Sequence, residues 1–292
     1  MNIVIFSNCA GNILTHMFNL HPYTSNKYTI HYISNYEHFD EVMSESNKNL
    51  FQTCDIFMYQ PLNNSYSHSM YNISHIKQLL KESCVILRVN YYRFKGFWFE
   101  SEYKPFSSFK AYKFVDSKYY GIHDSFTNFI GNKLEVCNKI QSLKIDTDAF
   151  MNHFSEELEN FKILDDNSDI KLYDFLIKNY KSKHLFHDVF HPTNLFFYEM
   201  FRQIVHKLTG HELNEEDLDF LNKLIDIEMT HWALPILPQI KSLLHINTPD
   251  TICVFYPGYA DKRIFMDIYD YYYIRLSHTN FQSYLDTHEE HK

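Results

Sequence analysis

Near its start the chain carries a cysteine in a small polar turn. An apolar run, Ile3–Phe6, is followed by the small or polar residues 7–12, which include Asn8, Cys9 and Gly11. This pattern predicts a β-strand that turns sharply into a helix, and it places Cys9 at the C-terminal edge of a sheet, where open α/β folds bind ligands. The positive end of that helix would lower the pKa of the thiol.

The same turn offers hydrogen-bond donors to an anion. Free backbone N–H groups at Gly11 and Asn12, with the side-chain amide of Asn8, would suit a developing oxyanion or a bound cofactor. The alternative is that Cys9 is a small buried hydrophobe that only ends the strand.

Much later the chain places a carboxylate and an imidazole three residues apart. Asp188 and His191 would lie side by side in a turn, with His187 as a second imidazole in reach. Asp188 either orients the ring of a catalytic His191 or caps the following helix while His191 acts alone. A zinc site on these three residues is disfavoured, because side chains so close along the chain do not converge on one ion. Cys9, Asp188 and His191 together indicate an acyl-transfer site.

Polar residues also end two other predicted strands. Gln60 follows one of them and should share the sheet edge with Cys9. Arg88, Asn90 and Arg93 end or follow the next one, and Arg93 with Lys95 are candidates for binding cofactor phosphates. Ordinary surface charge is the alternative for each of these cations.

The first half of the chain alternates between strand and helix patterns. Strands are predicted over residues 2–6, 28–34, 55–61 and 84–89, with helices over residues 11–20 and 74–81. This alternation predicts βαβ units and a mostly parallel sheet.

Beyond about residue 140 the pattern becomes largely helical. Helices are predicted over residues 146–164, 170–180, 194–208 and 215–229, with Asp148 and Asp169 as N-caps. Residues 251–276 have β-type content around Pro257-Gly258, which predicts a hairpin with strands at 252–255 and 271–274. We therefore divide the chain into residues 1–245 and a β-rich extension, residues 246–292, packed on the same domain.

Composition limits the class of protein. The net charge of −9, with both signs interleaved, disfavours a nucleic-acid partner. No apolar run approaches the ~18 residues of a membrane span, and the start lacks the features of a signal peptide. Five scattered cysteines without CxxC spacing disfavour a disulfide framework or a thiolate metal site and favour a reducing, cytoplasmic setting, which is the host cytoplasm if the gene is viral.

With these segments placed, the chain resembles the WcbI-type capsular polysaccharide biosynthesis proteins, which are CoA-binding acetyltransferases. Their Gly-Asn-Cys-Gln turn is similar to residues 7–10, which keep Asn8 and Cys9 and change both flanks. The resemblance continues through short motifs at residues 55–61, 170–176, 185–192 and 234–240, and covers about residues 2–245. The same skeleton is distantly similar to SGNH hydrolases, with Cys9 in the nucleophile position and Asp188 and His191 in an Asp-x-x-His motif.

The resemblance implies an SGNH-like α/β fold and transfer of an acetyl group from acetyl-CoA to a sugar or nucleotide-sugar hydroxyl or amine in glycan biosynthesis, without a metal. His191 would deprotonate the acceptor for direct transfer, or Cys9 would carry the acetyl group first. CoA contacts are expected from seven residues: Asn8, Cys9, Gly11, Asn12, Gln60, Arg93 and His187. Two alternatives stay open: a Cys-His-Asp esterase or thioesterase, and a non-catalytic CoA-binding module. The oligomeric state is left open, with a homo-oligomer compatible.

Overall fold

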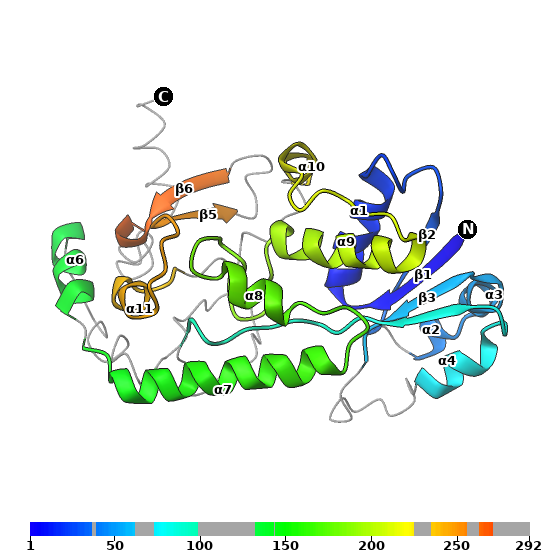
Figure 1. Cartoon of the computed structure of the whole chain (residues 1–292), viewed down its shortest axis with the longest axis horizontal. Helices are drawn as coiled ribbons and strands as arrows, with labels where there is room; N and C mark the ends of the chain where they lie inside the picture. The colour runs from blue at the N-terminus through cyan, green and yellow to red at the C-terminus, as the bar shows by residue number, and fades with distance from the viewer. Residues whose placement is uncertain are drawn as a thin grey trace. The chain divides into compact units, whose positions relative to one another are not determined.

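The computed structural model of the 292-residue chain describes residues 1–36, 39–61, 73–98, 132–142, 144–224, 235–255 and 263–270 (Figure 1). The chain divides into two compact units. Unit 1 comprises residues 1–92, 161–177 and 192–228, and unit 2 comprises residues 93–160, 178–191 and 229–292. Within the described ranges, no helix is long and apolar enough to cross a membrane.

Unit 1 is built on a parallel four-stranded sheet. Its strands are β1 (Asn2–Ser7), β2 (Thr29–Ser34), β3 (Ile56–Tyr59) and β4 (Val85–Arg88), in the order β2-β1-β3-β4. The register pairs Phe6 with Tyr59 and Ser7 with Ser34, so the C-terminal ends of the strands meet at one edge. All four residues of β3 are buried, as expected for an apolar run in the middle of a parallel sheet. The predicted α/β fold with a parallel sheet is confirmed.

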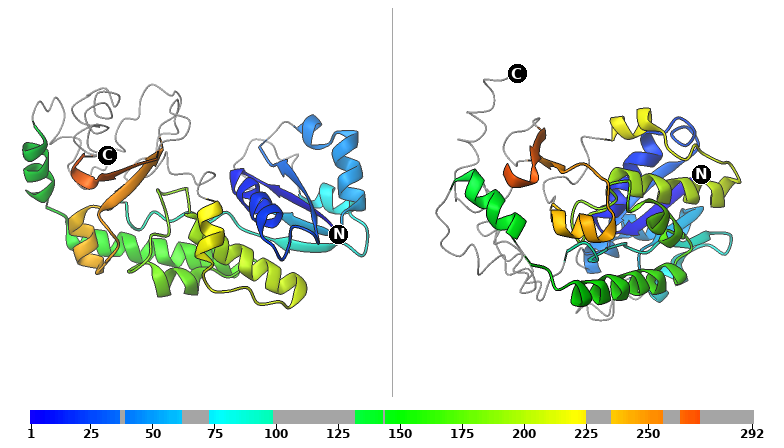
Figure 2. Two further views of the ribbon diagram at one scale, coloured as in Figure 1. Left: turned by 90° about the horizontal axis from the view of Figure 1, so that it is seen from above. Right: turned by 60° about the vertical axis from the view of Figure 1, so that its left-hand side comes forward.

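Helices cover both faces of this sheet (Figures 1 and 2). Side chains alternate along β1, so Val4 and Phe6 share one face. There they pack with residues of α2 (Phe39–Val42), α3 (Glu45–Thr53) and α4 (Ile73–Leu79). Ile5 points to the other face, which is covered by α1 (Cys9–Leu20), and α1 in turn packs against α9 (Asn194–Thr209).

The strand order creates a topological switch point between β1 and β3. The chain leaves β1 through α1 to reach β2 on one side, and later adds β3 and β4 on the other. In open parallel sheets, ligands bind in the crevice outside the carboxyl ends of the two strands at such a point. Cys9 follows β1 and Gln60 follows β3, so these two residues flank the switch point.

Unit 2 in the described ranges holds α6 (Lys133–Ser142), most of α7 (Thr147–Asp166), α11 (Pro238–Leu244) and an antiparallel pair, β5 (Thr251–Phe255) and β6 (Arg263–Asp267). Helix α8 (Tyr173–Asn179) begins in unit 1 and ends in unit 2. Helix α10 (Leu218–Lys223) belongs to unit 1. The aromatic core of unit 2 includes Phe94, whose ring lies 5.8 Å from that of Phe186.

The structure corrects several expectations about element ends. An antiparallel hairpin is present with β6 as its second strand, and the strand predicted at 271–274 lies outside the described residues. The helix predicted over 215–229 is α10, shorter in the described residues. Asp146, not Asp148, caps α7 by accepting from the N–H of Ala149 at 3.0 Å. Asp169 caps no helix, because its carboxylate contacts β4 instead. The proposed boundary at residue 245 stays a prediction.

Candidate active site

The turn after β1 has the predicted strand-to-helix form. Asn8 is the N-cap of α1, and its side-chain oxygen accepts from the N–H of Ala10 at 3.0 Å. The carbonyl oxygen of Asn8 accepts from the N–H of Gly11 at 2.8 Å. Cys9 is the first residue of the helix and is partly buried. The helix therefore begins at the residue that carries the thiol.

Gln60 fixes this turn from the neighbouring strand β3. Its side-chain oxygen accepts three hydrogen bonds: from the Ser7 hydroxyl and the Asn8 N–H, both at 3.0 Å, and from the Asn35 amide at 3.4 Å. A backbone N–H can only donate, so the contact with Asn8 settles which end of the amide faces the turn. Among the described residues, the Nε2 of Gln60 has no partner, and its two donors are directed away from Asn8.

Tyr32 of β2 holds the next peptide unit of the same turn. Its hydroxyl donates to the carbonyl oxygen of Asn8 at 2.9 Å. Burial raises the pKa of Tyr32, and the nearby Tyr36 raises it further, so the hydroxyl keeps its proton. Sequence reasoning missed Tyr32 and Asn35. The signal was present, because both lie within two residues of the end of a predicted strand.

Gly11 has a packing role that differs from the predicted one. Its N–H is engaged by Asn8, so the expectation of a free donor at Gly11 is wrong. The first N–H groups of the helix are paired within the turn, because the side-chain oxygen and the carbonyl oxygen of Asn8 accept from them. A Cβ at Gly11 would lie 2.8 Å from both the Ser7 Cβ and a ring carbon of Tyr32. Only glycine lets α1 approach the sheet this closely. Asn12, one residue on, is exposed.

The electrostatics of Cys9 also differ from the prediction. Burial raises the pKa of the thiol, and this effect outweighs the N–H groups of Ala10 and Cys9, which lower it. The predicted lowering is therefore wrong, because the helix end does not compensate for the water that the thiol loses. At neutral pH, Cys9 is a protonated thiol.

The turn that carries His191 belongs to unit 2 and joins a carboxylate to the imidazole. The Asp188 Oδ2 lies 2.7 Å from the His191 Nδ1. Its Oδ1 accepts from the backbone N–H groups of Phe190, at 2.6 Å, and His191, at 2.8 Å. Thr193, not Asp188, caps the helix that follows. Of the two roles left open for Asp188, the geometry fits the one in which it orients the ring.

The surroundings of this pair are mostly closed to solvent. The side chains of His191 and Asp188 are 18% and 10% exposed. His187 is buried, its N–H donates to the carbonyl oxygen of His191 at 2.7 Å, and its ring lies 5.4 Å from that of His184. In the described part of the chain, no group of three or more potential ligands could hold a metal ion.

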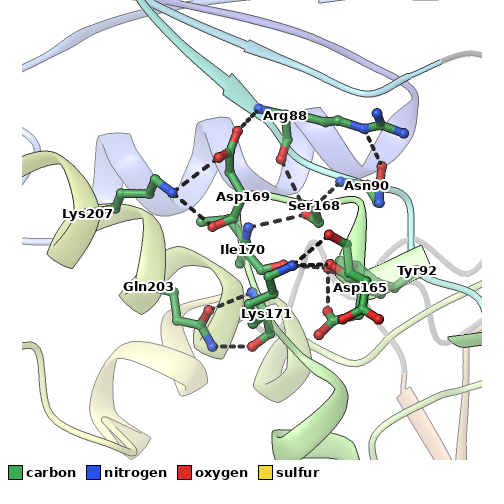
Figure 3. Close-up of polar contacts among 11 residues, drawn as sticks. Arg88, Asn90, Tyr92, Asp165, Ser168, Asp169, Ile170, Lys171, Gln203 and Lys207 are labelled. Atoms are coloured by element: carbon green, nitrogen blue, oxygen red, sulfur yellow. Dashed lines mark hydrogen bonds and ion pairs between the residues drawn. The ribbon is translucent and has the colours of Figure 1, made fainter. Parts of the chain in front are cut away.

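The polar residues after β4 divide into two groups. Arg88 and Asn90 belong to a network in unit 1, in which the Arg88 Nε lies 3.4 Å from the Asn90 side-chain oxygen (Figure 3). The Asn90 amide also donates to the carbonyl of Leu164, so it ties β4 to the end of α7. Arg93 is exposed in unit 2, and Lys95 is half-buried. The Cys9 turn and Gln60 come together in unit 1, and Asp188, His191 and His187 come together in unit 2.

Two comparisons with known proteins find matches that extend over most of the chain. A family model described as polysaccharide biosynthesis enzyme WcbI matches residues 2–213. A solved structure of WcbI, described as a novel polysaccharide biosynthesis enzyme in its native form without a disulfide bond between CoA and a cysteine, shares 14% identity at a TM-score of 0.50. The match covers 95% of this chain and 88% of that one, and it shows a common fold. No curated protein matches the sequence significantly.

Proposed function

Because the chain belongs to the WcbI family of polysaccharide biosynthesis enzymes, we propose that it transfers an acetyl group from acetyl-CoA to a hydroxyl or amino group of a sugar. A nucleotide-linked amino sugar is the acceptor class that we would test first. The family supports the sugar acceptor. The donor is supported by the solved WcbI structure, whose description names CoA.

The observation that carries the proposal is the contact between Asp188 and His191. An imidazole whose Nδ1 donates to a carboxylate at 2.7 Å presents its Nε2 as a base. The two backbone N–H groups that Asp188 also binds prevent the carboxylate from rotating away. The ring is therefore held in one tautomer and one orientation before any substrate binds.

In the proposed reaction, acetyl-CoA supplies an acetyl group activated as a thioester. The acceptor oxygen or nitrogen forms the new bond to the acetyl carbon while the bond from that carbon to the CoA sulfur breaks. His191 Nε2 takes the proton that the acceptor loses and returns it to the departing sulfur. Asp188 stabilises the imidazolium between these two transfers.

Cys9 contributes as a neutral thiol in this scheme. A raised pKa disfavours a thiolate that would take the acetyl group itself, so we propose direct transfer, in which Cys9 contacts the thioester. An amine acceptor needs less activation than a hydroxyl, which also suits a mechanism without an acetyl-cysteine.

The residues at the edge of the sheet in unit 1 fit the donor. The Nε2 of Gln60 is fixed in direction and offers two hydrogen-bond donors beside the switch point. Asn8 and Asn12 add side-chain amides in unit 1. In unit 2, Arg93 and Lys95 are the proposed phosphate ligands. Gly11 stays among the proposed CoA-binding residues, but its contribution is that it lets α1 approach the sheet closely. His187 stays in the proposed cofactor set, although it is buried.

A hydrolase is the second candidate, and the same Asp188–His191 pair favours it, since the pair could equally deprotonate water. A non-catalytic CoA-binding module is the third. The experiment that separates enzyme from module measures two properties of each variant: CoA affinity by calorimetry, and CoA release from acetyl-CoA in a pool of sugars and nucleotide sugars.

His191→Ala should lower turnover by about 100-fold or more, the scale for the loss of a general base, while CoA affinity changes little. The matched control is His206→Ala, because His206 also pairs with a carboxylate, that of Glu212 at 3.0 Å, but lies on an exposed part of α9. The control should keep full turnover. A folded His191→Ala protein that releases CoA at the wild-type rate would remove His191 from the mechanism.

A further inference from the structure

Two cysteines outside the candidate active site lie in contact. The Sγ atoms of Cys54 and Cys84 are 3.7 Å apart, although 30 positions separate these residues in the sequence. Cys54 is the C-cap of α3 and lies just before β3, and Cys84 immediately precedes β4, so both lie at the N-terminal end of the sheet, away from the Cys9 turn. Cys54 is 0% exposed, whereas Cys84 is only partly buried. One thiol of the pair is thus accessible and the other is sheltered.

The backbone places these cysteines at a spacing that a disulfide can bridge. Strands β3 and β4 are paired in register from Ile56 and Val85, and the Val85 N–H donates to the Asp55 carbonyl at 2.9 Å. Extending this register by one residue sets Asp55 opposite Cys84, so Cys54 and Cys84 are diagonal neighbours just before the ladder begins. Strand spacing and rise give a Cα–Cα distance of about 6 Å, inside the roughly 4.4–6.8 Å range of disulfides. A small side-chain rotation would therefore suffice.

The surroundings of the two thiols act differently on their pKa values. Burial raises the pKa of Cys54 to about 12, and the neighbouring Cys84 adds to this rise. Burial also raises the pKa of Cys84, but the S–H of Cys54 and the ammonium group of Lys81 oppose it. Cys84 is also the more accessible sulfur, so it is the thiol that a reagent reaches first. Thiol–disulfide exchange begins with the more available thiolate.

We propose that Cys54 and Cys84 are a modification site: a dithiol that a small-molecule disulfide oxidises to an intramolecular disulfide. The Cys84 thiolate attacks one sulfur of the reagent and releases one thiol, leaving a mixed disulfide. Cys54 then loses its proton and attacks the Cys84 Sγ, which expels the second thiol. The protein dithiol loses two electrons and two protons, and the reagent gains them as two thiols.

The experiment incubates the reduced full-length protein with excess oxidised glutathione, alkylates the remaining thiols and maps the peptides by mass spectrometry. The expected product has lost two hydrogen atoms and contains a peptide linking Cys54 to Cys84. Cys9 and Cys137 serve as internal controls, because neither has a cysteine in contact among the described residues and each can stop only at the mixed disulfide. The oxidised protein should melt roughly 3–8 °C higher than the reduced one.

Two variants make the result decisive without any assay of acetyl transfer. Cys84→Ser should abolish both the linked peptide and the rise in melting temperature, while Cys54→Ala should leave glutathione on Cys84. Persistence of a Cys84–glutathione adduct in the wild type, with Cys54 still open to alkylation after unfolding, would overturn the proposal. So would a failure of both cysteines to react while the unfolded chain does.

Discussion

Replacing Asp188 by Asn separates the two functions of that side chain. Asparagine has the same shape, so its oxygen can still accept the backbone N–H groups of Phe190 and His191, which now contact Oδ1 at 2.6 and 2.8 Å. Its NH2 group then faces the His191 Nδ1 in place of Oδ2. Two donors cannot share a hydrogen bond, so the ring must shift its proton to Nε2. The proposed base is then lost although the turn is kept.

The expected magnitudes differ for activity and stability. Turnover should fall by about 10⁴-fold, the effect of forcing the wrong histidine tautomer in an Asp-His pair. Stability should fall by only about 1 kcal/mol, because two hydrogen bonds become neutral rather than charge-assisted. Asp188→Ala, by contrast, leaves two backbone N–H groups without their acceptor beside a side chain only 10% exposed. That change should cost about 2–4 kcal/mol.

The assay combines CoA release, thermal unfolding and ¹⁵N NMR of the imidazole of His191. The spectrum should report the proton on Nδ1 in the wild type and on Nε2 in Asp188→Asn. Glu212→Gln is the control, since it changes the carboxylate next to His206 at the surface and should alter neither rate nor unfolding. An Asp188→Asn protein with wild-type turnover, or one with the proton still on Nδ1, would refute the argument.

Three further predictions concern unit 1. The alkylation rate of Cys9, read by peptide mapping, should keep rising above pH 9.0, the ordinary thiol value, and a plateau below pH 8 would show an activated thiolate instead. Gly11→Ala should lower the free energy of unfolding by about 1–3 kcal/mol, because its Cβ would clash with the sheet, and an unchanged denaturation midpoint would exclude that clash. Burial raises the pKa of Asp169, but the Arg88 N–H and Lys207 outweigh it, so the folded pKa is lowered. The stabilisation is present above the unfolded pKa and lost as pH falls through the folded one. Because the side chain is 38% exposed, Asp169→Asn should cost only about 1 kcal/mol at pH 7, and a loss that persists at pH 2 would contradict this origin.

Local pattern predicted the parts of the site that depend on neighbours in the sequence. The apolar run before Asn8 and the small residues after it specify a strand and a capped helix. The spacing of Asp188 and His191 brings their side chains together within one turn. The apolar run ending at Tyr59 is typical of a buried parallel strand, and β3 is fully buried. The run ending at Arg88 also forms a parallel strand, β4, but at the edge of the sheet, where Val85 and Ile86 are exposed. These signals are short-range, so one sequence suffices to read them.

Contacts between distant residues could not be predicted in this way. Asp169 looks like a helix cap in the sequence, yet its carboxylate accepts from the Arg88 N–H, 81 positions away (Figure 3). The three donors that converge on Gln60 come from the ends of different strands, and they meet only once the order of the sheet is known. Pairing of this kind depends on topology rather than on local spacing.

The remaining differences between the sequence-based expectations and the structure come from burial. Helix α3 was missed because, of its nine residues, only Phe51 is buried, which leaves no apolar periodicity to detect. For Cys9, the favourable helix end was visible in the sequence, but the loss of solvent around the thiol was not. The sign of a pKa shift is a balance of both effects, and only the folded structure supplies the second one.

The most direct test of acetyl transfer follows the acetyl group itself. Acetyl-CoA labelled with ¹³C in the acetyl group is incubated with the enzyme and a panel of sugars and nucleotide-linked amino sugars, and all products are identified by mass spectrometry. We expect the label on a sugar hydroxyl or amine, formed at the rate of CoA release and reduced about 100-fold or more by His191→Ala. Label recovered only as free acetate, at the same rate with or without sugar, would contradict the account and identify a hydrolase.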